Sequence, residues 1–380
     1  MIYLFCFLIV AYCIALIVLL IGFFRLSIYS SEGISPQTHF SVLIPFRNEA
    51  KNLPKLLKSI SNLDYPIELF EFIFIDDAST DASEAIIQTI ILEQTTNKNI
   101  SFRIIKNQRH SASPKKDAIT AAITISKHEW ILTTDADCEL PKNWLRTFDA
   151  YIQENNPMMI TAPVRYESND SLLEEFQKFD GLSLQGVTIG SFALGRPLLC
   201  NGANLGYKKS VFNQVKGFIG NDHIASGDDV FLMEKFIKHD ALKVCYLKSK
   251  DAIVVTQPQK SWEDVINQRI RWASKTSKQK NPFSTLLGLL VFLANVFLLI
   301  IPVYCLYRPQ HWTVFIVFLV LKLFMDYIVL KTTAGFFGTK INLLRFILSA
   351  LSYPMLVIRV VLGSISGTYE WKGRKFEKQA

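Results

Sequence analysis

The chain has 380 residues and a formal net charge of +8, and half of its residues are hydrophobic. This hydrophobic content and the positive mean hydropathy exceed what a soluble domain usually carries, so part of the chain is expected to lie in lipid. The basic residues cluster beside apolar segments rather than among aromatic residues that read RNA, which favours anionic lipid head groups over nucleic acid as the partner.

The first apolar segment runs from Met1 to Phe24 without a charged residue. At about 1.5 Å rise per residue, a helix of this length crosses a hydrocarbon core of roughly 30 Å. A cleaved signal peptide is the alternative, but it would have a basic start and a shorter apolar run. We therefore expect an uncleaved transmembrane anchor over residues 1–25.

A mixed globular sequence over residues 38–283 alternates short apolar runs with helical patterns. The spacing predicts strands at 40–45, 70–75, 102–106 and 130–134. Helical periodicity follows the first strand at Leu53, Leu56, Leu57 and Ile60, and follows the second strand at Ile86, Ile87 and Ile90. This alternation predicts an α/β fold, in which helices cover both faces of a mostly parallel sheet.

Acidic residues stand where two of these strands end. Asp76 and Asp77 follow the second strand, and Asp135 and Asp137 follow the strand at 130–134. Ligands of open parallel sheets bind outside the carboxyl ends of the strands, near a topological switch point. Helix capping is the alternative for the first cluster, because Ser79 or Asp81 suits the start of a helix at residue 82.

The Asp135-Ala136-Asp137 segment predicts a metal site. Side chains alternate in an extended segment, so both carboxylates are expected to face one divalent ion. Mg²⁺ and Mn²⁺ prefer oxygen ligands, and Mg²⁺ usually takes only one or two protein carboxylates, with phosphates and water completing its shell. A nucleotide diphosphate would supply such phosphates.

A second acidic pair, Asp228-Asp229, precedes an amphipathic helical pattern that begins at Val230. Structural capping of that helix is one interpretation. The other is that two adjacent acids in a cleft raise one another's pKa, which would suit one of them to accept a proton.

The segment from Gln268 to Trp272 lies just before the next apolar stretch. On a helix, Gln268, Arg271 and Trp272 share a face, and Arg269 is expected to point elsewhere. Arg271 could bind a diphosphate with two parallel hydrogen bonds, and Trp272 could stack on a sugar ring. Anchoring at the membrane surface is the alternative, since arginine and tryptophan are common there.

Three further apolar stretches span 285–307, 312–330 and 341–365, within a membrane region expected over residues 284–367. Residues 268–280 carry basic side chains and no acidic ones, which predicts that the globular domain is cytoplasmic. Three crossings would place the tail at 368–380 outside, whereas its basic residues predict a cytoplasmic tail. We therefore expect two crossings, with the third stretch re-entrant or interfacial. Four charged residues interrupt the last two stretches: Lys322, Asp326, Arg345 and Arg359.

Six cysteines, at positions 6, 13, 138, 200, 245 and 305, show no metal-ligand spacing. Reduced thiols are therefore expected, in keeping with a cytoplasmic domain.

Taken together and in this order, the motifs resemble the family 2 glycosyltransferases, in particular the integral-membrane branch that includes cellulose synthase, hyaluronan synthase and ceramide glucosyltransferase. The resemblance runs from about Phe40 to Trp272. It implies the type A nucleotide-sugar-binding architecture together with transmembrane helices.

The resemblance also implies roles for individual residues. Ser41 to Glu49, with Pro45 and Arg47, is similar to the opening strand and loop beside the nucleotide base, and Asp76 and Asp77 resemble the pair that contacts base and ribose. Lys115 resembles a lysine near the donor, and the segment Asn201 to Lys209 resembles a loop between donor and acceptor. The expected metal ligands are Asp135 and Asp137, with Asp135 also near the donor. The residues expected to act in catalysis are Asp228, Asp229 as the base, Gln268, Arg271 and Trp272.

The implied activity is inverting, Mg²⁺- or Mn²⁺-dependent transfer of a sugar from a nucleotide-sugar donor, expected to be UDP-linked, to a membrane lipid or a growing glycan. A multi-pass protein of the cell (inner) membrane, active in cell-envelope glycan or glycolipid synthesis, is expected. The alternatives are a processive polysaccharide synthase, a catalytically inactive scaffold of the same fold, and a nucleotidyl or phosphoryl transferase. Against a nucleotidyl or phosphoryl transferase, the sequence contains no phosphate-binding G-x-x-x-x-G-K-[ST] motif.

Overall fold

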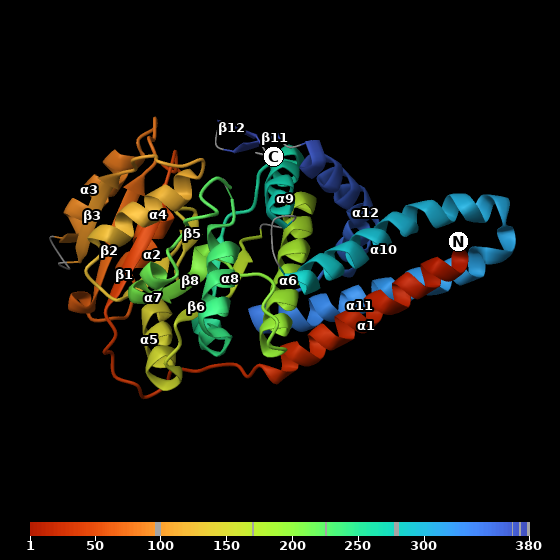
Figure 1. Ribbon diagram of the computed structural model, residues 1–380, viewed down its shortest axis with the longest axis horizontal. Coiled ribbons are helices and arrows are strands. Elements are labelled where there is room, and N and C mark those ends of the chain that lie inside the picture. Colours follow the sequence, from red (N-terminus) through yellow and green to blue (C-terminus); the bar gives the residue numbers. More distant parts are fainter. Residues whose placement is uncertain are drawn as a thin grey trace.

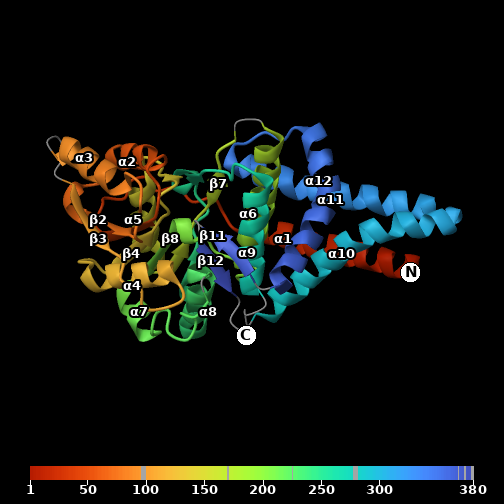
Figure 2. The same ribbon diagram turned by 90° about the horizontal axis from the view of Figure 1, so that it is seen from above.

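The computed structural model describes residues 1–95, 100–168, 171–224, 226–276, 281–366, 368–371 and 374–377. Figure 1 shows a globular half built around a sheet, and a bundle of long helices that projects from it. Two helices stand between these halves in both Figure 1 and Figure 2: α6, Leu172–Ala193, and α9, Trp262–Thr276. Of the basic residues used to predict orientation, Lys278, Lys280, Lys372 and Lys378 lie outside the described residues.

The globular half contains a seven-stranded sheet in the order β3-β2-β1-β4-β8-β6-β9. Its strands are β1 Phe40–Phe46, β2 Phe70–Asp76, β3 Ser101–Lys106, β4 Trp130–Thr133, β6 Met159–Thr161, β8 Leu205–Lys208 and β9 Val244–Tyr246. All described pairings are parallel except those of β8 with β4 and β6. The chain runs from β1 outward to β3 and returns to β4 on the other side of β1, which creates a switch point. The predicted mostly parallel sheet is confirmed.

Helices cover both faces of this sheet, as the alternating pattern predicted. Along β1, Val42 and Ile44 pack on one side, with α2 Leu53–Ser61, α3 Ser83–Thr95 and α5 Trp144–Asn155. Leu43 packs on the other side, with α4 Pro114–Ile125, α7 Lys209–Gln214 and α8 Asp228–Asp240. Because both faces are buried, the strands read as continuous apolar runs.

The remaining small elements were not predicted from the sequence. A three-stranded sheet pairs β5 Cys138–Glu139, β10 Val254–Thr256 and β7 Val164–Tyr166, and a C-terminal hairpin pairs β11 Thr368–Trp371 with β12 Arg374–Glu377. The short 3₁₀ turns are Ile67–Leu69, Gly202–Asn204, Ala241–Lys243, Lys250–Ala252 and Pro309–His311.

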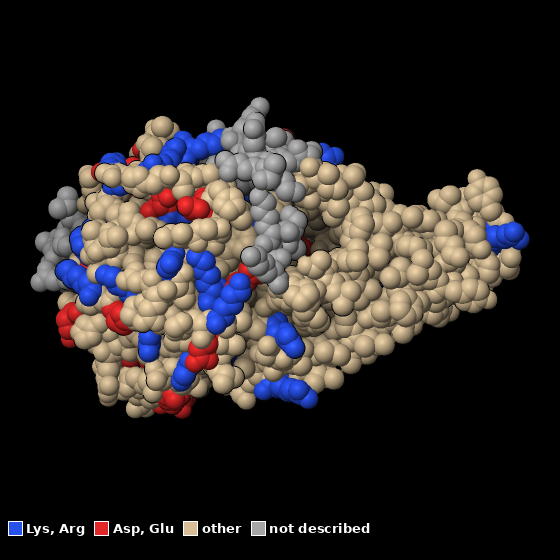
Figure 3. All heavy atoms as spheres, in the orientation of Figure 1, with Lys and Arg blue, Asp and Glu red and all other residues tan. Residues whose placement is uncertain are grey.

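Four of the described helices are long and apolar enough to cross a membrane: α1 Ile2–Arg25, α10 Pro282–Tyr307, α11 Trp312–Phe337 and α12 Leu343–Ser366. Phe5 and Ile9 of α1 pack against Leu298 of α10 and Phe315 of α11. Figure 3 shows that the face of the projecting bundle is almost free of charged side chains between its base and its tip. This surface suits the hydrocarbon core of a bilayer.

Helix α12 lies differently from the other three long helices. In both ribbon views α1, α10 and α11 follow the long axis of the molecule, whereas α12 runs across that axis beside α9 (Figures 1 and 2). One face of α12 exposes Leu344, Leu348, Leu351, Met355 and Leu362, and the opposite face buries Phe346 and Val360. A lipid-facing side opposite a protein-contacting side occurs in transmembrane and interfacial helices alike, so it is the orientation of α12 across the bundle axis that distinguishes it from α1, α10 and α11.

Two contacts join α1 to the globular half. At its crossing with α6, a Cβ on Gly22 would lie 2.3 Å from the carbonyl oxygen of Gly190, so the two backbones touch only because both positions are glycine. Beyond the crossing, the buried Lys248 donates to the carbonyl oxygens of Phe23 and Leu26 at 2.6 and 2.8 Å. These contacts fix the sheet relative to the bundle.

Candidate active site

The carboxyl ends of the central strands meet at one edge of the sheet. The parallel register aligns Phe46 of β1 with Asp76 of β2, and Asp76 with Lys106 of β3. The next residues of these strands, Arg47, Asp77 and Asn107, therefore lie side by side, and Asp135 follows β4 on the other side of β1. The sequence analysis predicted a ligand site at this edge, and the strand order brings its residues together.

A large cavity of about 1600 Å³ opens at this edge and extends to the helices α6, α9 and α12. Its lining includes nearly all residues singled out in the sequence: Pro45, Arg47, Glu49, Asp77, Lys115, Asp135, Asp137, Asp228, Asp229, Gln268, Arg271 and Trp272. Gly181 of α6 and Tyr353 of α12 line it as well. The cavity therefore reaches from the sheet to the helices at the base of the bundle.

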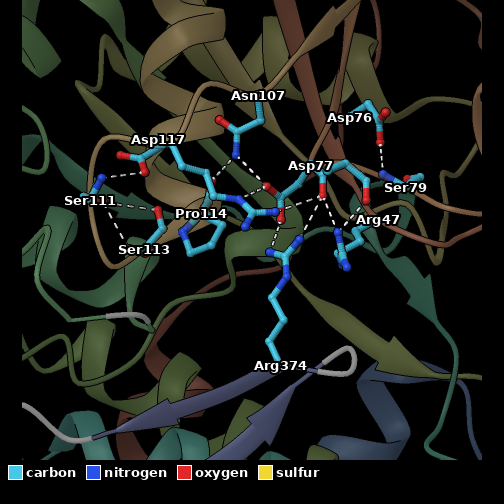
Figure 4. Close-up of polar contacts among 12 residues, drawn as sticks. Arg47, Asp76, Asp77, Ser79, Asn107, Ser111, Ser113, Pro114, Asp117 and Arg374 are labelled. Carbon is cyan, nitrogen blue, oxygen red and sulfur yellow. Dashed lines mark hydrogen bonds and ion pairs between the residues drawn. The ribbon is translucent and has the colours of Figure 1, made fainter.

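Asp77 directly follows β2 and lines the cavity. Its carboxylate and carbonyl oxygens accept hydrogen bonds from arginine side chains and from one side-chain amide (Figure 4). Its Oδ1 accepts from Asn107 at 2.9 Å and from the Arg109 guanidinium at 2.8 Å. Its Oδ2 accepts from Arg374 of the C-terminal hairpin at 2.6 Å. Arg47 donates to the Asp77 carbonyl oxygen at 2.8 Å. These guanidinium groups give this end of the cavity a positive character that suits an anionic ligand.

Asp76, the neighbour of Asp77, is placed differently. It is buried, does not line the cavity, and accepts from Lys106 at 2.8 Å and from the backbone N–H of Ser79 at 2.8 Å. Burial opposes ionisation of Asp76, but these hydrogen bonds outweigh it and lower its pKa. Asp76 thus stabilises the turn after β2, in which Ala78 has a positive φ of 57°.

Lys115, in the first turn of α4, lies between two carboxylates of the cavity. Its Nζ is 2.7 Å from Asp135 Oδ1 and 3.3 Å from Asp228 Oδ2. Burial alone would lower the pKa of Lys115, but the three nearby carboxylates raise it above its ordinary value. Gly202 permits this arrangement, because a Cβ there would lie 3.2 Å from Asp228 Oδ2 and 3.5 Å from the Lys115 Nζ. The segment from Asn201 therefore packs against the ion pair.

Asp135 and Asp137 both line the cavity, but the backbone that carries them is not the extended segment that the sequence predicted. The segment after β4 is a turn, closed by the N–H of Cys138 donating to the Asp135 carbonyl oxygen, and the predicted extended geometry is wrong. No group of three or more His, Cys, Asp or Glu side chains in the described ranges could hold a metal ion. Two carboxylates at an open cavity still fit Mg²⁺ or Mn²⁺, provided that phosphates and water complete the coordination shell.

Asp229 begins α8 beside Asp228, after Gly227 with φ 81°. Its Oδ1 is 3.2 Å from the Nζ of Lys275 on α9 and accepts from the N–H of Val230 at 2.7 Å. Burial opposes ionisation, but Lys275 and Lys115 lower the pKa of Asp229 below its ordinary value. The predicted raising of this pKa by the adjacent acid is therefore wrong, because lysine side chains from two other helices outweigh it.

The residues of α9 also differ from the prediction in one respect. Gln268, Arg271 and Trp272 line the cavity as expected, but Arg269 lines it too and does not point away. The Arg269 guanidinium lies 4.0 Å from the centre of the Trp272 ring and donates to Gln268 Oε1 at 2.7 Å. Arginine side chains are long enough to turn back toward the shared face of their own helix.

Sequence reasoning did not select several residues that contact the predicted site residues, among them Asn107, Arg109, Lys275 and Arg374. Asn107 follows directly after the predicted strand at 102–106, and the rule that ligands lie beyond strand ends could have identified it. Lys275 was considered only as a membrane-flanking charge. Arg374 lies 297 residues from Asp77, and no local pattern points to that contact.

Comparison with known families identifies two matching models in overlapping parts of the chain. Residues 41–216 match the model described as glycosyl transferase family 2, and residues 130–362 match the model described as glycosyl transferase family group 2. The second match covers more than half of the chain and includes α9 to α11 and most of α12.

Individual relatives match shorter segments. The poly(ribitol-phosphate) beta-N-acetylglucosaminyltransferase TarS of Staphylococcus aureus strain Mu50 is 28% identical over 117 residues, 31% of this chain and 19% of TarS. The beta-monoglucosyldiacylglycerol synthase of Nostoc sp. strain PCC 7120 is 27% identical over 105 residues, 28% of this chain and 21% of the synthase. The chain thus matches only about a fifth of the length of either relative.

One solved structure matches nearly the whole fold. The mannosyltransferase PcManGT from Pyrobaculum calidifontis, in complex with GDP-Man and Mn²⁺, has a TM-score of 0.55 and 15% sequence identity. The match covers 94% of this chain and 99% of PcManGT. At this identity the likeness establishes the fold, including helices outside the sheet domain.

The ion pair between Asp229 and Lys275 predicts a pH-dependent stability. A lowered pKa means that ionised Asp229 stabilises the fold above the ordinary aspartate pKa, and that this contribution is lost as the pH falls through the lowered value. Replacing Lys275 with Met leaves a buried carboxylate without its nearest counter-ion. We expect Lys275→Met to lower the free energy of unfolding at neutral pH by about 1–3 kcal/mol, with a smaller loss in acid. Thermal unfolding across pH measures this.

Lys238→Met is the matched control, because Lys238 is exposed on the same helix as Asp229. It should leave the unfolding midpoint unchanged. The loss should also shrink when Lys275→Met is combined with Asp229→Asn, since the paired charge is then absent. An equal loss in the double variant would show that Lys275 acts through other contacts.

Proposed function

Since the chain belongs to the family 2 glycosyltransferases, we propose that it transfers a sugar from a nucleotide donor, expected to be UDP-linked, to a membrane-associated acceptor with inversion at the anomeric carbon. One observation carries the proposal. One cavity is lined by the ends of the central strands, by two carboxylates suited to a metal, by a buried carboxylate suited to a base and by the helices at the base of the bundle. Each of these parts comes from a different element.

The donor would bind along the strand ends. Its base and ribose would lie near Pro45, Arg47, Glu49 and Asp77, which line that end of the cavity. Asp76 was expected to share this role, but it lies beneath the cavity and would act through the turn that holds Asp77. Asp77 Oδ2 accepts from Arg374 in the described contacts, so the C-terminal hairpin would form part of this pocket.

The donor diphosphate would lie near Lys115, Asp135, Asp137 and Arg271. PcManGT is a complex with Mn²⁺, and Asp137 and Asp135 of this chain would hold such an ion or Mg²⁺. The ion would supply positive charge to the departing diphosphate. Lys115 stays protonated because of its carboxylate neighbours, and it would add a further positive charge on the same side.

Asp229 would remove the proton from the acceptor hydroxyl. As the acceptor oxygen bonds to the anomeric carbon, the bond from that carbon to the diphosphate oxygen breaks, and the diphosphate leaves with the electron pair. A single displacement of this kind inverts the anomeric configuration. Lys275 and Lys115 keep the buried carboxylate of Asp229 in the ionised form that accepts a proton, and by lowering its pKa they also make it a weaker base than an ordinary aspartate. Asp228 would hold Lys115 beside it.

The acceptor would approach from the membrane side. The cavity is lined there by Trp272 of α9 and by Tyr353 and Val360 of α12, whose opposite face is apolar and exposed. A relative named as a monoglucosyldiacylglycerol synthase supports a lipid acceptor, and TarS supports a glycan-like one. A lipid with a free hydroxyl is favoured, because the membrane-side opening lies at the helix that we place in the interface.

We propose a topology in which α1, α10 and α11 cross the membrane and α12 lies along its cytoplasmic surface. The contact between Arg374 and Asp77 supports a C-terminal hairpin on the same side of the membrane as the catalytic domain. An even number of crossings must therefore separate α9 from the hairpin, which α10 and α11 provide. Arg269, Arg271 and Lys275, just before α10, support a cytoplasmic catalytic domain.

The alternatives predict different products. A processive synthase would release many nucleotides for each acceptor and give a long polymer. A nucleotidyl or phosphoryl transferase would release a nucleoside monophosphate or pyrophosphate. An inactive scaffold would release nothing, although each proposed catalytic position in this chain has a side chain able to do the chemistry.

The activity is tested by nucleotide release from the purified protein in nanodiscs. A panel of UDP- and GDP-sugars is supplied with Mn²⁺ or Mg²⁺, with and without a membrane lipid extract. We expect nucleoside diphosphate release that needs the metal and rises with lipid. Asp229→Asn should lower kcat by about 10²–10⁴-fold, which is the usual range for a lost base. Asp137→Ala should remove the dependence of nucleotide release on the metal, because it removes a proposed metal ligand.

Asp251→Asn is the control for these variants, because Asp251 is exposed and does not line the cavity. It should retain the parent rate. Full turnover by a folded Asp229→Asn variant would contradict the role of Asp229. Release of a monophosphate or pyrophosphate would contradict glycosyl transfer.

The topology is tested with cysteine labelling in intact cells. Gln310 lies in the exposed connection between α10 and α11, and Lys340 lies between α11 and α12. Each is replaced by cysteine, as Gln310→Cys and Lys340→Cys. A membrane-impermeant maleimide should label Gln310→Cys from outside, and it should label Lys340→Cys only after permeabilisation. The parent chain measures background from the native cysteines. Labelling of Lys340→Cys in intact cells would contradict the proposed topology.

A further inference from the structure

Arg269 of α9 is a buried arginine that contacts two of the residues proposed for catalysis. Its guanidinium lies over the Trp272 ring at 4.0 Å and donates to Gln268 Oε1 at 2.7 Å. Its charge is balanced by Asp180 of α6, with an Nε to Oδ2 distance of 2.5 Å. Arg269 and Asp180 are only 7% and 6% exposed. The ion pair is therefore largely removed from water.

A third helix joins the same cluster. The hydroxyl of Tyr353 on α12 donates to Asp180 Oδ1 at 3.3 Å, so each oxygen of the Asp180 carboxylate contacts a different helix. Phe176, one turn before Asp180, also packs against the Tyr353 ring. The helices α6, α9 and α12 thus meet at a single carboxylate on the membrane side of the cavity.

The contact between Arg269 and Gln268 fixes the orientation of the Gln268 amide. Arginine can only donate hydrogen bonds, so the atom that faces it must be the amide oxygen. The amide NH₂ of Gln268 then points away from Arg269 and is left to donate to oxygen atoms of a ligand in the cavity that Gln268 lines. The guanidinium also limits the rotamers of the Trp272 indole, since the cation–π contact favours the arrangement in which the ring faces the cation.

We propose that Arg269 and Asp180 are positioning residues that orient Trp272 and Gln268 for sugar transfer, and that Tyr353 extends this support to α12. The proposal rests on the proposed glycosyl transfer at the same cavity. A buried ion pair is a costly way to hold helices together, because well-packed apolar residues usually do so equally well. The directed contacts to Trp272 and Gln268 give the pair a role that apolar residues lack.

The test replaces the whole ion pair, so that no unpaired charge is left inside the protein. The double variant Asp180→Leu with Arg269→Met should unfold within a few degrees of the parent, because the apolar pair keeps the packing. Its kcat for nucleotide release should fall at least tenfold, while the KM for the donor changes less than threefold. Parent-like kcat in a stable double variant would overturn the proposal.

Two further variants keep the test decisive if the double variant does not fold. Arg269→Lys keeps the positive charge but removes the planar guanidinium, and it should also lower kcat at least tenfold. Arg196→Lys is the matched control at an exposed arginine, and it should leave kcat unchanged. In a Trp272→Ala, Gln268→Ala background, Arg269→Lys should cause no additional loss, because Arg269 acts through those side chains. A further tenfold loss in that background would overturn the proposal.

Tryptophan emission separates this proposal from the proposed function. The Trp272 signal is obtained as the difference between a protein and its Trp272→Phe counterpart. We expect Arg269→Lys to change the intensity or wavelength of that signal, because the contact with the guanidinium is altered. This result is measurable even if no donor is turned over. An unchanged Trp272 signal would contradict the positioning role, whereas absent turnover alone would contradict only the glycosyl transfer.

Discussion

The parallel pairing of β1 with β2 and β4 is the constraint on which the rest of the site depends. Because both faces of these strands are buried, their register is fixed by packing on two layers of helices. The fixed register places Arg47, Asp77 and Asn107 side by side, and brings the turn with Asp135 and Asp137 to the same edge. A shift of one residue in β1 would turn its alternating side chains toward the wrong layers and separate the cavity residues.

The cavity gathers carboxylates that would repel one another without the lysines among them. Lys115 lies between Asp135 and Asp228, and Lys275 lies beside Asp229. Each pair joins different elements, since Lys115 belongs to α4 and Lys275 to α9. The charge balance therefore connects the sheet domain to α9, the helix that precedes the long apolar helix α10, and it keeps the proposed base ionised in the assembled fold.

The sequence predicted the strands β1 to β4, the acidic residues at the ends of β2 and β4, and the long apolar helices, because burial on both faces and long uncharged stretches leave strong local patterns. It did not predict the partners that set the state of those residues. Asp76 and Asp77 look alike in sequence, yet one is buried under the turn and the other lines the cavity. Helical spacing predicted that Arg269 points away from the cavity, but Arg269 lines the cavity and its long side chain reaches Asp180 on α6. Contacts such as Arg374 with Asp77 depend on tertiary packing alone.

The proposed reaction depends on a metal site that Asp135 and Asp137 form and that a nucleotide diphosphate completes. Electron paramagnetic resonance of Mn²⁺ titrated into the purified protein, with UDP or GDP present or absent, measures whether this site exists. We expect weak Mn²⁺ binding by the protein alone, at least about tenfold tighter binding with one of the nucleotides, and loss of that gain in Asp137→Ala. Equal nucleotide-dependent Mn²⁺ binding by the parent and by Asp137→Ala would contradict it.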